Sequence, residues 1–306
     1  MKKILVTGGA GFIGSHLCDE LIDLEYKVAV IDNLAAGKKE YINKKAKFYQ
    51  ADICNKKKIE KIFKKENFDY VFHLAAQIDV RISVADPELD NKINILGGLN
   101  ILENCRKYKV KKIFFSSTGG AIYREGELPA DEKSQADPVS PYGIHKLTFE
   151  KYLNYYYKVF DLKYIALRLA NVYGPRQYKG GEAGVIAIFT DKAVNQETAV
   201  IFGDGRQTRD YVYVNDVVNA FKKSLASSYV GELNIATGRE TNLLEIIKYI
   251  ENSLGRKIKY KFGPAKAGEM RRSCLSYKKA EKIFGWKPKV NIKEGIRRTI
   301  TWAQKK

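Results

Sequence analysis

The chain has 306 residues and 45% hydrophobic residues, enough for one large α/β unit with a smaller one appended. Its formal net charge is +19, but the lysine runs that produce it, such as 44–45, 56–58 and 64–65, are dispersed along the chain. A nucleic-acid-binding protein clusters its basic residues, so we expect no nucleic-acid partner. The apolar run after Met1 is short and broken by glycines, and no run approaches transmembrane length, so we expect a strand there rather than a signal segment, and no membrane partner.

The number and spacing of the cysteines and histidines limit the kinds of site that the chain can form. The four cysteines lie far apart without a Cys-x-x-Cys pair, and the three histidines show no ligand spacing. Neither a disulfide framework nor a metal site is indicated. We expect a cytoplasmic protein without a metal.

The first predicted element is a strand over residues 4–7 that ends in a glycine-rich turn and continues into an amphipathic helix. The glycines satisfy two spacings at once, G-x-G-x-x-G from Gly9 and G-x-x-G-x-x-G from Gly8. Glycine permits the sharp turn and lets a diphosphate touch backbone N–H groups at the helix start. This strand, turn and helix predict a dinucleotide-binding site. The residues expected to contact the cofactor here are Gly8, Gly11, Phe12, Ile13 and Gly14.

Asp32 closes the second predicted strand, residues 27–31, 18 positions after Gly14. A carboxylate at this place accepts hydrogen bonds from the adenosine ribose and would repel a 2′-phosphate. The sequence therefore favours NAD over NADP, although Lys38 and Lys39 leave the second cofactor open. The alternative is a helix-capping or turn aspartate with no ligand.

Strands and helices then alternate. We expect a strand at 47–50, a helix at 56–66, a strand at 69–76, a long helix at 87–107 and a strand at 112–118. Alternation of this kind predicts a doubly wound parallel sheet that binds ligands at the carboxyl ends of its strands. Asp52 lies at such an end, where it either meets the adenine or caps the next helix. The further residues expected at the cofactor are Asn33, Asp52, Ile53, Leu74, Ala75, Ala76, Asn94 and Ser116.

The residues that indicate chemistry are Thr118, Tyr142 and Lys146. Pro141 suits the first turn of a helix, and Tyr142 and Lys146 are then four residues apart on one face. A nearby ammonium, together with a nicotinamide cation, lowers a phenol pKa from its free value near 10 toward neutrality. A hydroxyl at the neighbouring strand end relays the proton. A Tyr-x-x-x-Lys pattern also arises by chance, and we interpret the other tyrosines of this helix as packing or interface residues.

Together these motifs resemble the extended short-chain dehydrogenase/reductases, and within them the UDP-glucose 4-epimerase group. The resemblance runs nearly end to end and rests on residues 7–14, 73–76, 116–118, 142–146, 168–175 and 202–214. It implies a Rossmann domain over 1–170, to which residues of about 210–238 return, and a smaller, mainly substrate-binding α/β domain over 171–306. It also implies a homodimer formed by the tyrosine-bearing helix and the 87–107 helix, with Tyr152 and Tyr156 suited to the contact.

The implied reaction is NAD-dependent 4-epimerisation of a UDP-hexose. In it Tyr142, as a phenolate, takes the 4-hydroxyl proton through or beside Thr118, the C4 hydride passes to NAD, and the transient 4-keto sugar turns before hydride returns. Lys146 binds the nicotinamide ribose. Related dehydratases and decarboxylases carry an acid after the strand-end hydroxyl; here Gly119 and Gly120 follow, which favours simple epimerisation.

The resemblance also implies a substrate set, and it leaves some positions open. Where the group expects an Arg-x-Gly-acid motif this chain has Lys266, so either Lys266 or Arg271 would hold the diphosphate. For Arg209 an ion pair with Asp210 or Asp216 is the alternative. The residues expected at the substrate are Thr118, Tyr142, Asn171, Val185, Phe202, Arg209, Lys266 and Arg271.

Substrate identity stays open in the sequence. The group's gatekeeper position falls near Ser273 or Cys274, and a small residue there leaves room for the N-acetyl group of UDP-GlcNAc or UDP-GalNAc. UDP-glucuronate is a rival substrate, whose carboxylate would meet Arg81, Lys92 or Arg176. Another nucleotide-sugar dehydratase or reductase is a further alternative, and a non-catalytic NAD-binding regulator or RNA-binding protein is the alternative of a different class. Tyr123 followed by Arg124, where the group usually has glycine, leaves that loop's shape uncertain.

Overall fold

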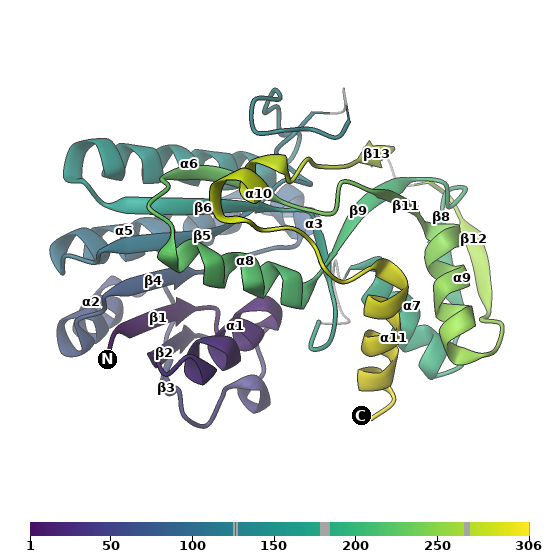
Figure 1. The fold of residues 1–306 in the computed structure, drawn as a ribbon, viewed down its shortest axis with the longest axis horizontal. Helices are drawn as coiled ribbons and strands as arrows, with labels where there is room; N and C mark the ends of the chain where they lie inside the picture. The colour runs from purple at the N-terminus through teal and green to yellow at the C-terminus, as the bar shows by residue number, and fades with distance from the viewer. Residues whose placement is uncertain (125, 127, 178–183, 266–269, 306) are drawn as a thin grey trace.

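A parallel sheet of seven strands forms the larger part of the molecule (Figure 1). The structure is a computed structural model that describes residues 1–124, 126, 128–177, 184–265 and 270–305. The strands lie in the order β10-β6-β5-β4-β1-β2-β3, and every neighbouring pair is parallel. They are β1 (Lys3–Thr7), β2 (Lys27–Asp32), β3 (Lys47–Gln50), β4 (Tyr70–His73), β5 (Lys112–Thr118), β6 (Lys163–Leu169) and β10 (Gly231–Ile235). The predicted doubly wound α/β fold is confirmed.

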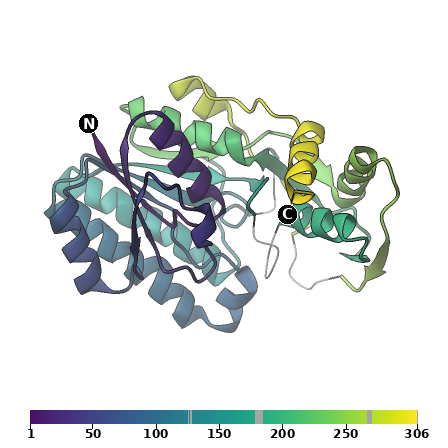
Figure 2. The ribbon, with the colours of Figure 1, turned by 90° about the horizontal axis from the view of Figure 1, so that it is seen from below.

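Helices cover both faces of this sheet because its strands alternate two apolar faces (Figures 1 and 2). In β1, Ile4 and Val6 belong to a core shared with α1 (Phe12–Asp23) and α8 (Val214–Ala226), whereas Leu5 belongs to the opposite core. That opposite core is formed with α2 (Lys56–Glu66), α5 (Gly98–Lys107) and α6 (Pro141–Phe160). The predicted helix at 56–66 is confirmed to the residue.

The helix expected at 87–107 is three joined segments rather than one regular helix. They are α4 (Pro87–Asn91), a π-helical turn η2 (Lys92–Gly97) and α5, and the short helix α3 (Val80–Ala85) precedes them. A Cβ on Gly98 would lie 2.4 Å from the Phe149 ring, and one on Gly97 would lie 2.8 Å from Ile53. The two glycines therefore let this helix approach α6 and the segment after β3 closely.

The second half of the chain builds two smaller sheets beside the large one. In the first, β9 (Thr208–Tyr213) is central and pairs with β7 (Asn171–Tyr173), β11 (Glu240–Asn242) and β13 (Arg272–Ser273). The second joins β8 (Ala199–Phe202) to β12 (Tyr260–Gly263). The remaining helices are α7 (Val185–Val194), α9 (Leu243–Leu254), α10 (Lys278–Phe284), α11 (Ile292–Ala303) and the 3-10 turn η1 (Lys39–Tyr41). Strand β10 returns to the edge of the large sheet; the domain limits themselves stay predictions.

Among the described residues, no helix is both long enough and apolar enough to cross a membrane.

Candidate active site

The glycine turn follows β1. The strand order of the sheet reverses between β1 and β4, and doubly wound sheets bind ligands at such a switch point. Gly8 has φ +73°, and a Cβ there would lie 2.7 Å from the Ala75 nitrogen. A Cβ on Gly14 would lie 2.2 Å from the Gly8 oxygen, so no side chain fits between turn and helix. No described side chain caps α1, whose first N–H groups and dipole stay available to an anion.

Side chains beneath the turn fix β1 against β4. Thr7 Oγ1 is hydrogen-bonded to His73 Nδ1 (2.8 Å) and accepts from the Ala75 nitrogen (3.2 Å). Burial, together with the charge of Lys146, lowers the pKa of His73 to about 3, so the ring is neutral. The hydrogen bond to Thr7 thereby holds Ala75 beside the glycine turn, where small side chains leave room for a ligand.

Asp32 points at the glycine turn from the end of β2. Its Oδ2 accepts from the Ala10 nitrogen (3.0 Å) and its Oδ1 from the Leu34 nitrogen (2.8 Å). A carboxylate has about four acceptor positions, so roughly two remain for hydroxyl groups of a ligand. Asp32 therefore holds the glycine turn and the loop after β2 together, and its remaining acceptor positions fit the predicted ribose contact. Lys38 is turned to Glu40 at 3.8 Å.

Asp52 and Asn33 line a polar hollow of about 380 Å³ beside Asp32, together with Gln50, Ala51, Asn55 and Lys58. Asn33 Nδ2 donates to Asp52 Oδ2 (3.1 Å), and the Cys54 nitrogen donates to Oδ1 (2.7 Å). Burial would raise the pKa of Asp52, but these hydrogen bonds hold it below its usual range. The helix cap of α2 is Asn55, which accepts from the Lys58 nitrogen (3.0 Å), so the capping alternative for Asp52 is wrong.

Of the three residues predicted to carry the chemistry, Tyr142 and Lys146 lie together on α6, and Thr118 ends β5. Lys146 is buried in α6 and donates to the Ser116 oxygen (2.9 Å), with its ammonium 4.6 Å from the Phe115 ring centre and 5.8 Å from that of Tyr142. The Tyr142 backbone nitrogen donates to Ser83 Oγ (3.2 Å), and this hydrogen bond fixes the start of α6. No hydrogen bond within the described residues uses the Thr118 hydroxyl. Ser116 reaches the site through its carbonyl.

Burial lowers the pKa of Lys146 to about 8, while the charges of Asp90 and Glu150 act in the opposite direction. A lysine poised near neutrality beside a phenol ring is the arrangement that general acid–base chemistry requires. An ammonium at this place would stabilise a phenolate on Tyr142, because opposite charges attract.

A buried ionic network behind Thr118 has no counterpart in the sequence-based set. Glu150 accepts from Ser117 Oγ (2.6 Å) and holds Arg168 in a bidentate pair, with Nη2 2.6 Å from Oε2. Arg168 also donates to Tyr123 Oη (2.8 Å), which donates to Asn234 Oδ1 (2.8 Å). Tyr123 is therefore anchored despite the arginine that follows it. The network fixes the ends of β5, β6 and β10 together.

Asn94 is buried, and its side chain is hydrogen-bonded within the protein. Its Oδ1 accepts from the Gln77 nitrogen (3.0 Å), and its Nδ2 donates to the Gln77 oxygen (2.9 Å) and to Asp90 Oδ1 (3.0 Å). Both amide protons are thus used inside the protein. Asn94 shapes the segment after Ala75 and Ala76, and only one acceptor position remains for a ligand. Leu74 and Ile53 are apolar residues expected at the same site. Ile53 is buried, and its carbonyl oxygen accepts from Asn100 Nδ2 (3.0 Å).

The predicted substrate residues gather around β9. Asn171 opens β7, which pairs with β9, and Ser273 of β13 is the register partner of Arg209. Arg209 donates to the Thr208 oxygen (2.8 Å), while the two carboxylates considered as its alternatives accept backbone bonds, Asp210 from Gly238 and Asp216 from Val290. Val185 begins α7. Phe202 ends β8 with 39% of its surface exposed.

Several of the cations considered for the substrate form ion pairs within the described residues. Arg271 forms a bidentate, exposed pair with Asp204 (Nη2 to Oδ2, 2.7 Å), so its role as a diphosphate ligand requires this pair to open. Lys266 lies outside the described residues. Arg176 pairs with Asp19 of α1 (2.8 Å) and Arg81 pairs with Asp79 (3.3 Å). Lys92 lies beside Asp52, whose pKa its charge lowers.

The interface tyrosines also need correction. Tyr156 is only 4% exposed and donates to Glu103, because it belongs to the core between α5 and α6; Tyr152 is half-buried against that core. Tyr155 is instead the exposed ring, at 49%. The i, i+4 spacing placed the tyrosines on the helix correctly but did not indicate which face turns outward.

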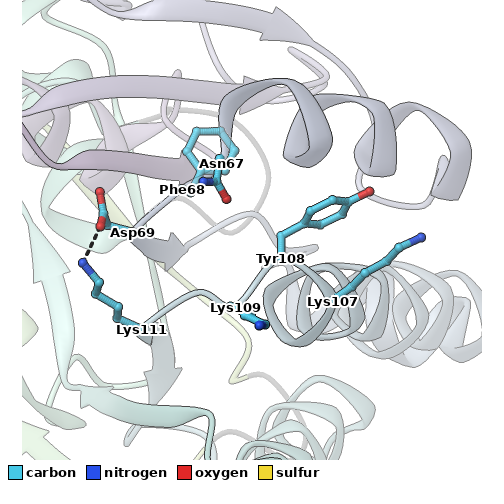
Figure 3. A pocket seen from close by; sticks show the side chains of 7 residues that line it. All are labelled: Asn67, Phe68, Asp69, Lys107, Tyr108, Lys109 and Lys111. Atoms are coloured by element: carbon cyan, nitrogen blue, oxygen red, sulfur yellow. Dashed lines mark hydrogen bonds and ion pairs between the residues drawn. The ribbon is translucent and has the colours of Figure 1, made fainter.

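A second hollow, of about 370 Å³, opens at the opposite edge of the sheet (Figure 3). It is lined by Asn67, Phe68, Asp69, Lys107, Tyr108, Lys109 and Lys111, none of them an expected site residue. Its Asp69–Lys111 ion pair (2.6 Å) lies largely in solvent. The residues expected to carry the chemistry lie instead at the carboxyl edge, where parallel sheets bind ligands.

Comparisons with known proteins agree with this geometry. The model of the NAD dependent epimerase/dehydratase family matches residues 4–236. A putative UDP-glucose 4-epimerase of Methanocaldococcus jannaschii is 48% identical over 98% of both chains. The crystal structure of the Thermotoga maritima UDP-glucose 4-epimerase with UDP-glucose superposes with a TM-score of 0.97 at 47% identity, covering 99% of each chain. A UDP-N-acetylglucosamine 4-epimerase of Methanobrevibacter ruminantium gives 0.93 at 36%, covering 98% and 97%.

Proposed function

This chain belongs to the NAD dependent epimerase/dehydratase family, and from that premise we propose that it is an NAD-dependent 4-epimerase that interconverts UDP-glucose and UDP-galactose. The observation that carries the proposal is the arrangement at the end of β5. There Lys146 is fixed by the Ser116 oxygen of β5, the strand that ends at Thr118, and lies beside the Tyr142 ring. This is a proton-transfer site at the ligand-binding edge of a dinucleotide-binding sheet.

The residues present fit NAD. A Cβ would fill the turn at Gly8 and Gly14, α1 starts without a side-chain cap, and Asp32 retains acceptor positions. Gly8, Gly11, Phe12, Ile13 and Gly14 would hold the diphosphate, Asp32 the adenosine ribose, and Lys146 the nicotinamide ribose. When bound, NAD would supply the hydride acceptor for the sugar C4 and the hydride donor for its return.

The chain's own residues transfer the proton and hold the nucleotide diphosphate. Tyr142, held as a phenolate by the Lys146 ammonium, accepts the proton of the sugar 4-hydroxyl and later returns it. Thr118 donates to or accepts from the same oxygen and orients it. Asn171 and Arg209 hold the diphosphate, so that the sugar turns while its nucleotide stays in place.

The surroundings favour epimerisation over elimination, which needs a second acid. Gly119 and Gly120 follow Thr118, and a Cβ on Gly119 would lie 2.2 Å from Leu275. The two buried carboxylates of this region are already bound, Glu150 to Arg168 and Asp90 to His145. UDP-glucuronate is disfavoured because the cations that would meet its carboxylate have partners or neighbours of their own, Arg81 with Asp79 and Arg176 with Asp19.

We propose that UDP-GlcNAc and UDP-GalNAc are accepted as well. Ser273 is the register partner of Arg209, whereas Cys274 turns its sulfur toward Asp210 (3.7 Å) inside the fold. Ser273 is therefore the residue beside the substrate, and its small side chain leaves room for an N-acetyl group at C2.

Two measurements test the proposal. Mass spectrometry of the purified protein identifies its co-purifying ligand, and we expect NAD. Initial rates are then compared on UDP-galactose, UDP-GlcNAc and UDP-glucuronate. Turnover of the first two is expected; absence of any UDP-glucose from UDP-galactose, together with salt-sensitive RNA binding, would contradict the enzyme assignment and favour an RNA-binding protein.

A homodimer through α6 and the helix from α4 to α5 is part of the proposal. Large apolar side chains are exposed on these neighbouring helices, with Leu96 52%, Tyr155 49%, Val159 56% and Phe160 41% exposed. Exposed apolar groups gathered on adjacent helices are typical of a contact with a second copy. Sedimentation should show a dimer that Val159→Lys weakens. The four unpaired cysteines, three of them buried, suit a reducing compartment, and we propose the cytoplasm.

A further inference from the structure

A second ionisable cluster lies beside Lys146 and has no part in the mechanism above. Its centre is Asp90 in α4, whose side chain has no exposed surface. One carboxylate oxygen accepts from Gln77 Nε2 (2.7 Å) and Asn94 Nδ2 (3.0 Å), and the other lies 2.5 Å from His145 Nδ1. One carboxylate thus ties together the segment after β4, the π-helical turn and α6.

Hydrogen-bond partners compensate for the burial of Asp90. An unpaired buried carboxylate is costly, and the two amide donors and the imidazole provide the compensation. His145 directly precedes Lys146 in α6, so the same contact sets the position of the lysine backbone. Asp90 is therefore both a mechanical anchor for α6 and a source of negative charge.

The other carboxylate near Lys146 is less available. Glu150 is held bidentately by Arg168, which neutralises its charge. The side chain of Asp90, by contrast, has two amide groups and the His145 imidazole as its partners among the described residues. Both carboxylates raise the pKa of Lys146 against the larger effect of burial.

The remaining charged groups around this cluster balance one another or lie in solvent. On α3, Asp79 pairs with Arg81; on α4, Glu88 is exposed; on η2, Lys92 is exposed. On β4, His73 is neutral because burial lowers its pKa to about 3. On β6, Arg168 belongs to Glu150.

We propose that Asp90, held in place by His145, is a positioning residue that keeps the Lys146 ammonium charged and oriented in the buried site. Its catalytic consequence rests on the proposed epimerase function, whereas its effect on Lys146 does not. Without the Asp90 charge, Lys146 loses its proton at lower pH, and the phenolate of Tyr142 loses its stabilising neighbour. The enzyme then works over a narrower pH range.

The titration of Lys146 tests the proposal directly. In protein labelled with ¹³C-lysine, the Cε chemical shift of Lys146 is assigned by its absence in Lys146→Met and followed with pH. Asp90→Asn keeps the shape of the side chain and removes its charge; we expect the midpoint to fall by at least about one pH unit, a tenfold loss of proton affinity. Glu88→Gln, which removes an exposed carboxylate from the same helix, should leave the midpoint unchanged.

Histidine variants separate charge from contact. His145→Asn keeps an N–H donor near the position of Nδ1 and should keep the wild-type midpoint, whereas His145→Ala admits water to Asp90 and should lower it by about half as much as Asp90→Asn. An equal fall in His145→Asn would assign the effect to the imidazole ring and overturn the proposal. An unchanged midpoint in Asp90→Asn overturns it too; if that variant does not fold, an unchanged midpoint in His145→Ala does so.

The rate profile supplies the second readout. In Asp90→Asn the alkaline limb of kcat should move to lower pH by the same amount as the lysine midpoint. A loss of kcat by one factor at every pH, with the midpoint unmoved, would show a structural role only and overturn the proposal. If the wild-type protein has no epimerase activity, the proposed function fails, while the lysine midpoint still decides the role of Asp90.

Discussion

The residues around Lys146 at the carboxyl edge of the large sheet and those around the hollow at the other edge hold their charges differently. At the carboxyl edge, ionic groups are buried and hydrogen-bonded in networks, as in the Glu150–Arg168 pair, and Lys146 is held without water. At the other edge, around the hollow of Figure 3, ion pairs such as Lys111–Asp69 lie in solvent. Buried charge is costly and exposed charge is nearly free. At the carboxyl edge this cost falls on the network that holds the proposed chemical residues; the amino edge carries it at Lys112, where burial also lowers a lysine pKa to about 8.

The largest effect should come from the phenol at the carboxyl edge. Tyr142→Phe removes the group that accepts the sugar proton, and we expect turnover to fall by at least about 10³-fold while bound NAD is retained. UDP-galactose conversion and the mass spectrum of the intact holoprotein measure the two effects. Tyr155→Phe, on the exposed face of the same helix, is the control and should keep its rate. Near wild-type turnover in Tyr142→Phe would remove Tyr142 from the mechanism.

Lys146→Met should separate function from stability at this edge. Turnover should fall by about 10²-fold, since the phenolate loses its cation. The folded protein releases the Lys146 proton near pH 8 but the unfolded chain near pH 10.5, so burial of the charge destabilises the wild type most below pH 8 and less as pH rises to 10.5. Urea unfolding should show Lys146→Met more stable than the wild type by on the order of 2 kcal/mol at pH 7.

That stability gain should shrink by pH 10, because the wild-type lysine is then neutral in the folded state. A gain of the same size at both pH values would contradict the account of Lys146 as a destabilised buried cation.

Breaking the ionic network tests the buried side of the comparison. Glu150→Gln leaves the Arg168 guanidinium without its charged partner, and we expect a loss of about 3–5 kcal/mol in the free energy of unfolding. Denaturant titration at pH 7 measures it. A change near zero would show that water reaches Arg168 and that the network does not hold the end of β5.

The smallest effect should come from the opposite edge. Lys111→Gln removes a solvent-exposed partner of Asp69, and we expect neither the unfolding midpoint nor the epimerase rate to change measurably. The same denaturant and rate assays apply. A clear loss of activity would show that this hollow communicates with the catalytic edge and would end the contrast between the two.

Local features were predictable from the sequence and long-range ones were not. The glycine turn and the helix at 56–66 follow from spacing within a few residues, and Pro141 marks the start of α6 because proline suits the first helical turn. The Glu150–Arg168 and Asp90–His145 pairs join residues 18 and 55 positions apart, and no periodicity connects them. The π-helical turn at 92–97 depends on the contacts of Asn94 with Gln77 and Asp90, so only the folded chain reveals it.

The candidate site divides in the same way. Tyr142 and Lys146 were predicted because four residues of helix place them on one face. The position of Arg271 could not be predicted, because its ion pair with Asp204 depends on how two distant loops meet. The same holds for Tyr156, whose burial is decided by α5 rather than by its own helix.

The path of the C4 hydrogen tests the central claim most directly. The protein is given UDP-galactose with deuterium at C4 in ordinary water, and the product is examined by mass spectrometry and NMR. Because hydride passes to the bound cofactor and back within one site, UDP-glucose should retain the deuterium at C4. Replacement of that deuterium by hydrogen from water would contradict the account.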